Sequence, residues 1–489
     1  MDINQIIADT ILISSEVILL ATALLALLYG LFFKEKTLHV QVILLCGMIF
    51  GAMHILPMQE AVYAFNGSIV INKATCVFRG FILLSSIITM LFMIGKDMKF
   101  EVPILMVIST FALMLMVSSN DLMTMYLTME LSALAMYICV SSSLESYSST
   151  EAGLKYFILG SIASCIFLLG TSIVSGFSGS FSFDTIGSFI ITTIDGELGD
   201  FMPIFLICGL VMIMAAFFFK VAAAPFHAWL ADVYKGSSWY ITVFLGSASK
   251  IAIAGLLIRC MYSLFDHLHA HMQHILAVVS VASMFIGSIA AIMQKDVKRI
   301  LAYSSVGNIG FALAAMSVES VNGIASGFVY IALYSLIMFM PAFALVGLLT
   351  PQGSDSLLLK DLNAVSKAHP YKAAVLAIVM LSTAGLPPFA GFFGKFYMLV
   401  TLIAHDMPVL SILFVIAAVL SSFYSIKVIK NIYFAKAEET VSCTSWRFPL
   451  RGFSVDMVVI SILCILNFIY CMYSSQVVSS FINLFSDFI

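Results

Sequence analysis

The chain has 489 residues, of which 62% are hydrophobic and only 10% are charged, and its formal net charge is −3. A soluble domain carries about a quarter charged residues, so this composition excludes a soluble globular protein and predicts an all-α polytopic membrane protein embedded in the lipid bilayer. The chain has no basic tract, which argues against a nucleic-acid partner. Its nine cysteines are scattered without a CxxC pair and are interpreted as small packing residues.

Recurring apolar runs of about 18 to 25 residues predict about fourteen membrane-spanning helices. We place them at 11–33, 39–58, 75–95, 102–119, 122–143, 152–175, 202–224, 239–262, 273–293, 299–317, 322–349, 371–404, 408–429 and 454–475. The twelfth run is too long for one straight helix and is therefore predicted to be bent or broken.

The basic residues between these runs or near their ends support the count because they gather on one side. That side holds Lys34, Lys36, Lys96, Lys99, Lys235, Lys295, Lys298, Arg299, Lys360, Lys367, Lys372, Lys430, Lys436, Arg447 and Arg451. The opposite side holds only Lys73, Arg79 and Arg259. The positive-inside rule places the first group in the cytoplasm or matrix, and an even number of spans places both termini on the periplasmic or intermembrane side.

Short matches within the sequence indicate an internal repeat. FFFK at 217–220 recurs as FFGK at 392–395, and GLKYFILGS at 153–161 resembles GFVYIALYS at 327–335 at nearly the same offset. These matches predict two blocks of five helices, helices 4–8 and 9–13, and an odd number of helices makes the two repeats inverted. The predicted organisation is 1–100 for helices 1–3, 101–262 for the first repeat, 263–436 for the second, and 437–489 for helix 14.

Five charged residues lie well inside the apolar runs: Glu130, Lys155, Lys220, Lys250 and Lys395. Each lysine would cost on the order of 3 kcal/mol at the bilayer centre, so these side chains must face protein, water or one another. Structural ion pairs are the simple alternative, but one carboxylate can fully pair with at most one lysine. The excess of lysine predicts groups that change protonation, because burial favours neutral lysine whereas arginine stays charged.

Two other acidic residues have simpler interpretations. Glu151 lies four residues before Lys155, where an ion pair can form along a helix, and Ser148 with Glu151 fits the capping box S-x-x-E. For Glu151 we favour capping and pairing over proton transfer. Glu16, in the first span, is interpreted as a structural acid that is either interfacial or buried.

Prolines interrupt two of the predicted helices. Pro225 follows Lys220 in the seventh, and Pro387 and Pro388 precede Lys395 in the twelfth. Proline frees backbone carbonyls, which a membrane tolerates only where protein or water satisfies them. A packing kink explains either break alone, but two breaks beside buried lysines favour polar sites near the midplane.

The histidines give weaker signals. His227 follows Pro225 and is either a bridge between lysine sites or a histidine satisfied by the backbone. A second group is interpreted as solvated surface, because an exposed loop has no definite metal geometry: Asp266, His267, His269, His271 and His274. The sequence has no histidine pair suited to haem, iron–sulfur cysteine run, P-loop or GxGxxG, so we expect no redox cofactor and no ATP hydrolysis in this chain.

Four segments are similar to those of one known family: STEAGLKYFILG (149–160), FKVAAAPFHAWLADVYKG (219–236), KRILAYSSVGNIGF (298–311) and GLPPFAGFFGKFY (385–397). They resemble the antiporter-like subunits of proton-pumping NADH:quinone oxidoreductase, respiratory complex I, over about residues 100 to 430. EAGLKYF and DVY-x-G point to the subunit N family among these relatives. The broader family includes the Mrp-type cation/proton antiporters.

The resemblance implies fourteen transmembrane helices with broken helices 7 and 12 in inverted repeats. It implies functional roles for Glu130 on helix 5, Lys220 on helix 7, Lys250 on helix 8 and Lys395 on helix 12, and for Lys155 of the EAGLKY motif. It further implies a bacterial inner membrane or mitochondrial inner membrane location, and other complex I membrane subunits as partners. NADH, FMN, iron–sulfur clusters and quinone are expected in those partners and not in this chain.

One departure bears on the chemistry. The family commonly has histidine where this chain has Asn308, in SSVGNIG, and asparagine cannot titrate. Lys235 also stands where glutamate is usual, and SSWYITVF (237–244) replaces a proline-containing segment.

The leading hypothesis is a proton path in which Glu130 controls the proton affinity of Lys220, and Lys220 passes a proton through Lys250 toward Lys395. The alternatives are an Mrp-type cation/proton antiporter subunit and a scaffold with an inactive channel, for which Asn308 is mild support.

Overall fold

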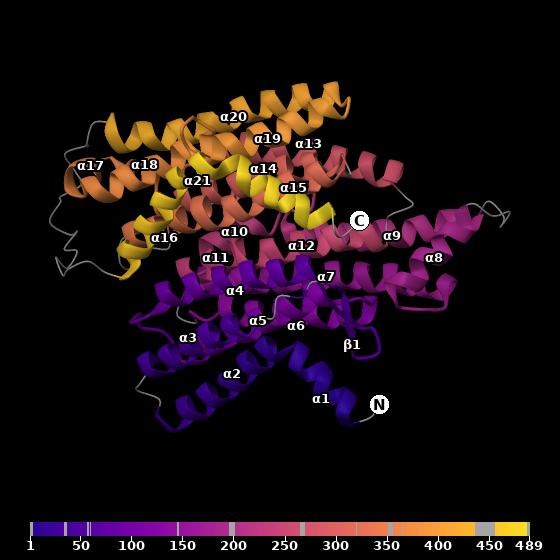
Figure 1. The fold of residues 1–489 in the computed structure, drawn as a ribbon. Helices are drawn as coiled ribbons and strands as arrows, with labels where there is room; N and C mark the ends of the chain where they lie inside the picture. The colour runs from indigo at the N-terminus through magenta and orange to yellow at the C-terminus, as the bar shows by residue number, and fades with distance from the viewer. Residues whose placement is uncertain are drawn as a thin grey trace.

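The computed structural model is almost entirely helical and describes residues 3–33, 37–55, 58, 60–143, 146–194, 201–264, 269–318, 320–350, 356–363, 365–435 and 455–486. Eleven helices within these ranges are long and apolar enough to cross a membrane. Most helices run roughly alongside one another in a single bundle (Figure 1). The structure therefore confirms an all-α polytopic membrane protein.

The first half of the chain contains a small β-hairpin among the helices. Strands β1 (Val62–Ala64) and β2 (Ile69–Ile71) pair antiparallel with Val62 opposite Ile71. The helices are α1 (Ile3–Leu12), α2 (Ser14–Phe32), α3 (Thr37–Met53), α4 (Lys73–Met93), α5 (Glu101–Ser118), α6 (Leu122–Val140), α7 (Tyr147–Ser178), α8 (Phe183–Ile194), α9 (Phe201–Val221), α10 (Leu230–Gly236), α11 (Trp239–Gly246) and α12 (Ala248–Ser263).

The second half is also helical and includes two irregular turns. The helices are α13 (His269–Met293), α14 (Val297–Met316), α15 (Val321–Leu333), α16 (Met340–Leu349), α17 (Val365–Ala368), α18 (Pro370–Ala384), α19 (Ala390–Ala404), α20 (Pro408–Tyr433) and α21 (Val455–Ser486). A π-helical turn, η2 (Tyr334–Phe339), joins α15 to α16, and a 3-10 turn, η3 (Leu359–Leu362), precedes α17.

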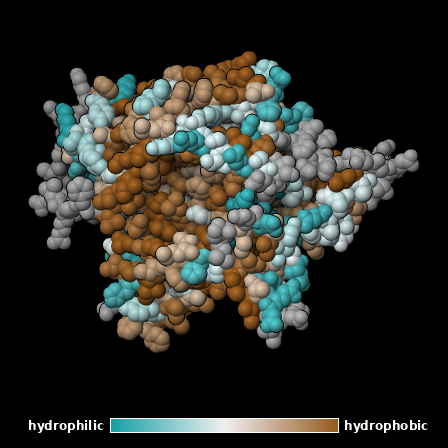
Figure 2. All heavy atoms as spheres, viewed as in Figure 1, coloured by the Kyte–Doolittle hydropathy of each residue, from teal (hydrophilic) through white to brown (hydrophobic). Residues whose placement is uncertain are grey.

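Apolar side chains form a band between two more polar ends of the visible face (Figure 2). Large apolar residues on the outer helices are well exposed, including Leu25, Val409 and Met472. Water would penalise such a surface, whereas hydrocarbon does not, so this band is where the bundle meets lipid. The start of α1 and the end of α21 lie toward the same side of the bundle (Figure 1), as an even number of spans predicts.

Side-chain oxygens cap the starts of several spans. The Asn72 side chain accepts a hydrogen bond from the Thr75 backbone N–H at 2.9 Å, and Asp121 accepts from that of Thr124 at 2.5 Å. Each satisfies a backbone donor that the first helical turn leaves free, which matters more where lipid replaces water. Asp121 thereby defines the start of α6, the helix that carries Glu130.

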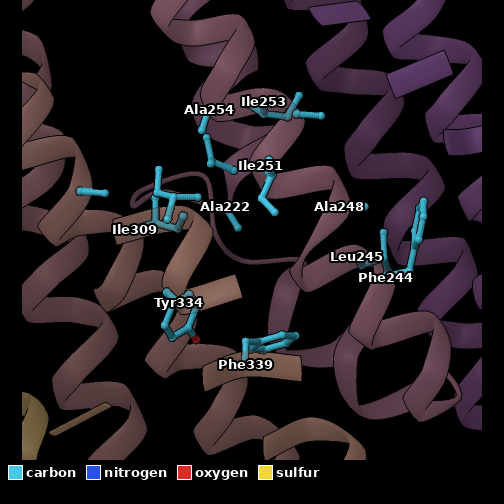
Figure 3. Close-up of a cluster of buried hydrophobic side chains, with 14 of the residues drawn as sticks. Ala222, Phe244, Leu245, Ala248, Ile251, Ile253, Ala254, Ile309, Tyr334 and Phe339 are labelled. Carbon is cyan, nitrogen blue, oxygen red and sulfur yellow. The ribbon is translucent and has the colours of Figure 1, made fainter. Parts of the chain in front are cut away.

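The α11–α12 and α15–α16 segments form the centre of the bundle. In their apolar windows 94% and 83% of residues are buried, against 33% in α2 and α21, which face outward. Figure 3 shows a buried apolar cluster that includes Ala222 after α9, Ile251 of α12 and Ile309 of α14, together with Tyr334 and Phe339. The polar groups described below are therefore set into a tightly packed apolar core.

Both predicted helix breaks are present. The seventh span ends at Val221 and helix resumes at Leu230, and the 371–404 run is divided into α18 and α19. Cis peptide bonds precede Pro225 and Pro388.

Other irregularities were not predicted. Span 239–262 is interrupted at Ser247, with φ −122° and ψ −80°, and span 322–349 contains the π-helical turn. Helix α1, the β-hairpin and helix α8 are also absent from the sequence prediction. Their apolar runs are too short to resemble membrane spans.

Candidate functional site

Each of the two helix breaks has a lysine beside it. Lys220 is the penultimate residue of α9, directly before the non-helical residues 222–229. Lys395 lies in the second turn of α19, after the break at residues 385–389. Gly385, with φ +82°, ends α18 in the left-handed region that favours glycine, and a Cβ there would lie 3.3 Å from the Lys395 Cδ. Glycine at position 385 therefore both ends α18 and leaves space for the Lys395 side chain beside the break.

Glu130 lies on α6 and is half-buried. Its Oε2 accepts a hydrogen bond of 2.7 Å from the Ser164 hydroxyl on α7. Lys220 lies within electrostatic range of this carboxylate, although no direct ion pair joins the two described side chains. The pair can therefore interact through charge without being locked together, as a proton-carrying lysine requires.

Lys250 is almost wholly buried in the first turn of α12, directly after the interruption at Ser247. Its ammonium donates a hydrogen bond to the Ser305 hydroxyl of α14. In the part of the chain that the structure describes, no carboxylate pairs with it. Burial without a counter-ion favours the neutral amine, so Lys250 has the environment of a group that can release a proton.

Lys395 is also buried and has only neutral partners among the described side chains. Its Nζ donates to the Thr383 carbonyl at 2.9 Å and to the Ser421 hydroxyl at 3.0 Å. The same nitrogen lies 4.7 Å from the centroid of the Phe311 ring, which stabilises a cation without holding it in an ion pair.

Polar side chains on α14 and its neighbours connect the Lys250 region to the Lys395 region. The Asn308 amide donates to the Ser304 carbonyl at 2.8 Å, and its oxygen accepts from the Tyr330 hydroxyl at 2.6 Å. Tyr334 and Tyr424, both buried, lie close to Ser304 and Asn308. Asn308 therefore lies at the centre of a tyrosine cluster, so polar side chains continue past this position although asparagine does not titrate.

The cluster reaches both lysines. Tyr334 also lies close to Ser305, the partner of Lys250. Tyr424 lies close to Ser425, whose hydroxyl is 3.1 Å from that of Thr383, beside Lys395. Sequence reasoning missed these tyrosines. Two of them, Tyr330 and Tyr334, lie in GFVYIALYS, which served only to indicate a repeat.

Lys155 differs from the other lysines, and the prediction that it lies deep in a span is wrong. Its side chain is 42% exposed and forms ion pairs of 2.7 Å with Glu151 and 2.8 Å with Asp232. Helix α7 extends over 32 residues, so its first turns lie at the polar end of the bundle. The predicted pair with Glu151 is confirmed, but the N-cap of α7 is Ser146 rather than Ser148.

Two arginines assigned to loops lie inside helices. Arg79 is buried on α4 and forms an ion pair with Glu16 of α2, which confirms Glu16 as a buried structural acid. Arg259 is buried on α12 and donates to the carbonyls of Val117 and Ser119 at 2.7 and 2.6 Å. Each arginine has local partners that offset its burial, which sequence position alone does not reveal.

His227 lies in the loop between α9 and α10. Its Nδ1 is buried, and the described residues offer it no hydrogen-bond partner. The ring centroid lies 6.2 Å from that of Tyr303 on α14. Of the other histidine group, Asp266 and His267 lie outside the residues that the structure describes. Among the described residues, no group of three His, Cys, Asp or Glu side chains is placed to hold a metal ion.

Comparison with known proteins agrees with this geometry. A family model described as the membrane region of NADH:quinone oxidoreductase and Mrp antiporters matches residues 119–421. NADH-quinone oxidoreductase subunit N of Paramagnetospirillum magneticum is 37% identical over 439 residues, covering 88% of this chain and 89% of that protein. The chain belongs to the NADH-quinone oxidoreductase subunit N family. Another member, subunit N 1 of Rhizobium meliloti, is 35% identical over 89% of this chain and 90% of its own length.

Solved structures share the fold of this subunit N family member. A chain of respiratory complex I from Thermus thermophilus with bound aureothin matches with a TM-score of 0.77 and 24% identity, covering 95% of this chain and 98% of that one. A chain of an archaeal membrane-bound sulfane sulfur reductase matches with a TM-score of 0.80 and 18% identity, covering 98% and 97%. At these identities the similarity concerns the fold alone.

Proposed function

We propose that this chain is a proton-translocating membrane-arm subunit of NADH:quinone oxidoreductase, driven by redox chemistry in partner subunits. The observation that carries the proposal is that Lys250 and Lys395 are buried without carboxylate partners among the described residues, and that a cluster of buried polar side chains lies near both. A lysine in this setting can both accept and release a proton, whereas a lysine in a fixed ion pair remains charged.

In the proposed path, the charge of Glu130 favours protonation of Lys220. Movement of that charge lets Lys220 pass its proton toward Lys250, with His227 as an accessory group near the break. From Lys250 the proton continues through Ser305 and the tyrosine hydroxyls, with water filling any gap.

Asn308 does not titrate in this scheme. It accepts a hydrogen bond from Tyr330 and so orients the neutral polar chain through which the proton passes to Lys395. The family resemblance implies a role for Lys155 as well, but its two carboxylate partners favour a positional role over proton transfer.

The proposed membrane architecture has fourteen spans. The observed helices group into this number when α9–α10, α11–α12, α15–α16 and α18–α19 are each counted as one interrupted span and α1, α8 and α17 are not counted. The two spans broken at prolines, which carry Lys220 and Lys395, are then the seventh and twelfth, as two inverted five-helix repeats at 101–262 and 263–436 require. Helices 1–3 and helix 14 flank these repeats.

The proposed setting is a bacterial inner membrane or a mitochondrial inner membrane, with both termini on the periplasmic or intermembrane side. Other membrane subunits, including antiporter-like ones, would pack beside this chain. NADH, FMN, iron–sulfur clusters and quinone would be held by partner subunits. The alternative, an Mrp-type cation/proton antiporter, has weaker support, because a chain of an Mrp complex from a Dietzia species shares the fold at only 17% identity.

Two substitutions at Lys395 test the proposal in the assembled complex. Lys395→Ala removes the proton carrier. Lys395→Arg introduces a side chain that stays protonated at physiological pH and so cannot release a proton. Both should lower the number of protons pumped per NADH, measured in sealed vesicles.

Lys427→Ala is the matched control. This lysine of α20 also donates to backbone carbonyls, those of Ile292 and Gln294, but near the end of its helix. Unchanged pumping stoichiometry and rate in both Lys395 variants would refute the assignment.

A further inference from the structure

The short helix α10 is held at its outer side by one carboxylate that two cations share. Asp232 Oδ2 accepts a hydrogen bond from Lys155 Nζ of α7 at 2.8 Å, and its Oδ1 accepts from Arg299 Nη2 of α14 at 2.7 Å. Glu151 is the second partner of Lys155. The four charges alternate in sign and join three helices.

The inner side of α10 is apolar and covers the break that follows Lys220. Tyr234 is fully buried, with its ring centroid 5.9 Å from that of Phe343 on α16. Trp229, at the start of α10, stacks on Tyr156 of α7 and donates to the Phe219 carbonyl at 3.0 Å. A displacement of α10 would therefore disturb the end of α9, where Lys220 lies.

The connection of α10 to the rest of the chain is weak on one side. Residues 222–229 are not helical, so no continuous backbone hydrogen bonding fixes α10 to α9. A helix of seven residues has little stability of its own and needs tertiary contacts to keep its place. On the polar end of the bundle, the contact from Asp232 to both neighbouring helices supplies this.

We infer that Asp232 is a positioning residue that holds α10 closed over the Lys220 break by bridging Lys155 and Arg299. The inference rests on the proposed function for its consequence, because a displaced α10 would admit water to Lys220 and uncouple pumping from electron transfer. Lys155 thereby gains a structural role as one side of this bridge. Loss of the carboxylate leaves Lys155 with Glu151 alone and removes the Arg299 contact to α10, so both ionic links between α10 and its neighbouring helices through residue 232 are lost.

Cysteine accessibility in the assembled complex tests the bridge directly. Ala231 is buried on α10, so Ala231→Cys places a thiol that becomes accessible only when α10 moves. We measure the rate at which a charged maleimide labels this thiol. The labelled peptide shows that the reaction occurs at this position and not at another cysteine. Adding Asp232→Asn should raise the labelling rate about tenfold. This corresponds to a loss of about 1.4 kcal/mol in the free energy that favours the closed position of α10.

Further variants separate the bridge from general damage. Asp232→Glu keeps the carboxylate and should keep the slow rate, whereas Arg299→Gln removes one contact and should accelerate labelling even if Asp232→Asn does not assemble. Lys96→Gln breaks another ion pair, that of 2.6 Å with Asp456, which includes no residue of α10, and should not change the rate.

The two proposals can fail separately. Equal labelling rates with and without Asp232→Asn and with and without Arg299→Gln would overturn the bridge, whatever the pumping result. Faster labelling, together with fewer protons pumped per NADH at unchanged assembly, supports both the bridge and the path. Faster labelling in Asp232→Asn, with normal pumping in the Lys395 variants, would uphold the bridge and refute the proton path.

Discussion

Single residues in this chain have roles that depend on their partners rather than on their type. Lys250 and Lys155 are both lysines in apolar helices, yet Lys250 donates to a serine hydroxyl while Lys155 pairs with two carboxylates. The first environment permits a change of protonation, and the second keeps the charge. Asn308 likewise becomes part of a polar chain only because Tyr330 donates to it.

The ion pair of Glu16 and Arg79 gives a prediction at the residue scale. Both side chains are almost fully buried, so Glu16→Gln leaves the Arg79 charge without compensation. We expect a loss of about 3 to 5 kcal/mol in stability, the usual cost of removing one partner of a buried pair. The melting temperature and yield of the assembled complex measure this loss.

A double variant provides the control. Glu16→Gln with Arg79→Met replaces the charged pair with groups that need no counter-ion, and it should recover most of the lost stability. If the double variant is as unstable as Glu16→Gln alone, charge is not the cause.

At the scale of the helix, interruptions determine where polar groups lie. Sequence reasoning located the breaks at Pro225 and at Pro387 because proline acts locally on the backbone. It did not find the interruption at Ser247, where no proline marks the chain, or the π-helical turn at Tyr334–Phe339, which ends just before Pro341. Those two irregularities lie beside Lys250 and within the tyrosine cluster, so the unpredicted elements belong to the proposed path as much as the predicted ones.

Gly385 gives a prediction at this scale. Gly385→Ala forces a side chain into the left-handed region and against the Lys395 side chain, at a cost of about 1 kcal/mol. We expect lower stability together with slower pumping, because the alkyl chain of Lys395 must move.

Gly176→Ala is the matched control, since a Cβ at Gly176 in helix α7 would meet no atom within 4 Å. Thermal stability and proton pumping are measured on both variants. Equal behaviour of the two would show that the α18–α19 break does not depend on glycine.

At the scale of the whole molecule, one bundle combines an apolar outer band with a buried polar interior. The outward helices α2 and α21 expose large apolar residues to lipid, while the central segments α11–α12 and α15–α16 carry Lys250 and two of the tyrosines. This arrangement keeps charge away from hydrocarbon, where each lysine would cost on the order of 3 kcal/mol. We favour a proton path over a passive scaffold because Lys250 and Lys395 have no carboxylate partner among the described residues.

Combined neutralisation of the lysine row tests that preference. The triple variant Lys220→Ala, Lys250→Ala and Lys395→Ala should assemble but pump fewer protons per NADH than the parent complex. Electron transfer from NADH to quinone is measured in the same vesicles to report the state of the partner subunits. Normal pumping would favour the scaffold hypothesis.

The sequence alone correctly predicted the membrane class, the two proline breaks and the burial of Lys250 and Lys395. These follow from properties that lie along the chain: the length of apolar runs, the geometry of proline and the cost of charge in lipid. Only the tertiary structure decided which lysine is paired, which arginines are buried and what lies beside Asn308. Those facts depend on contacts such as Lys155 with Asp232, 77 residues apart, and Lys250 with Ser305, 55 residues apart, which no local pattern encodes.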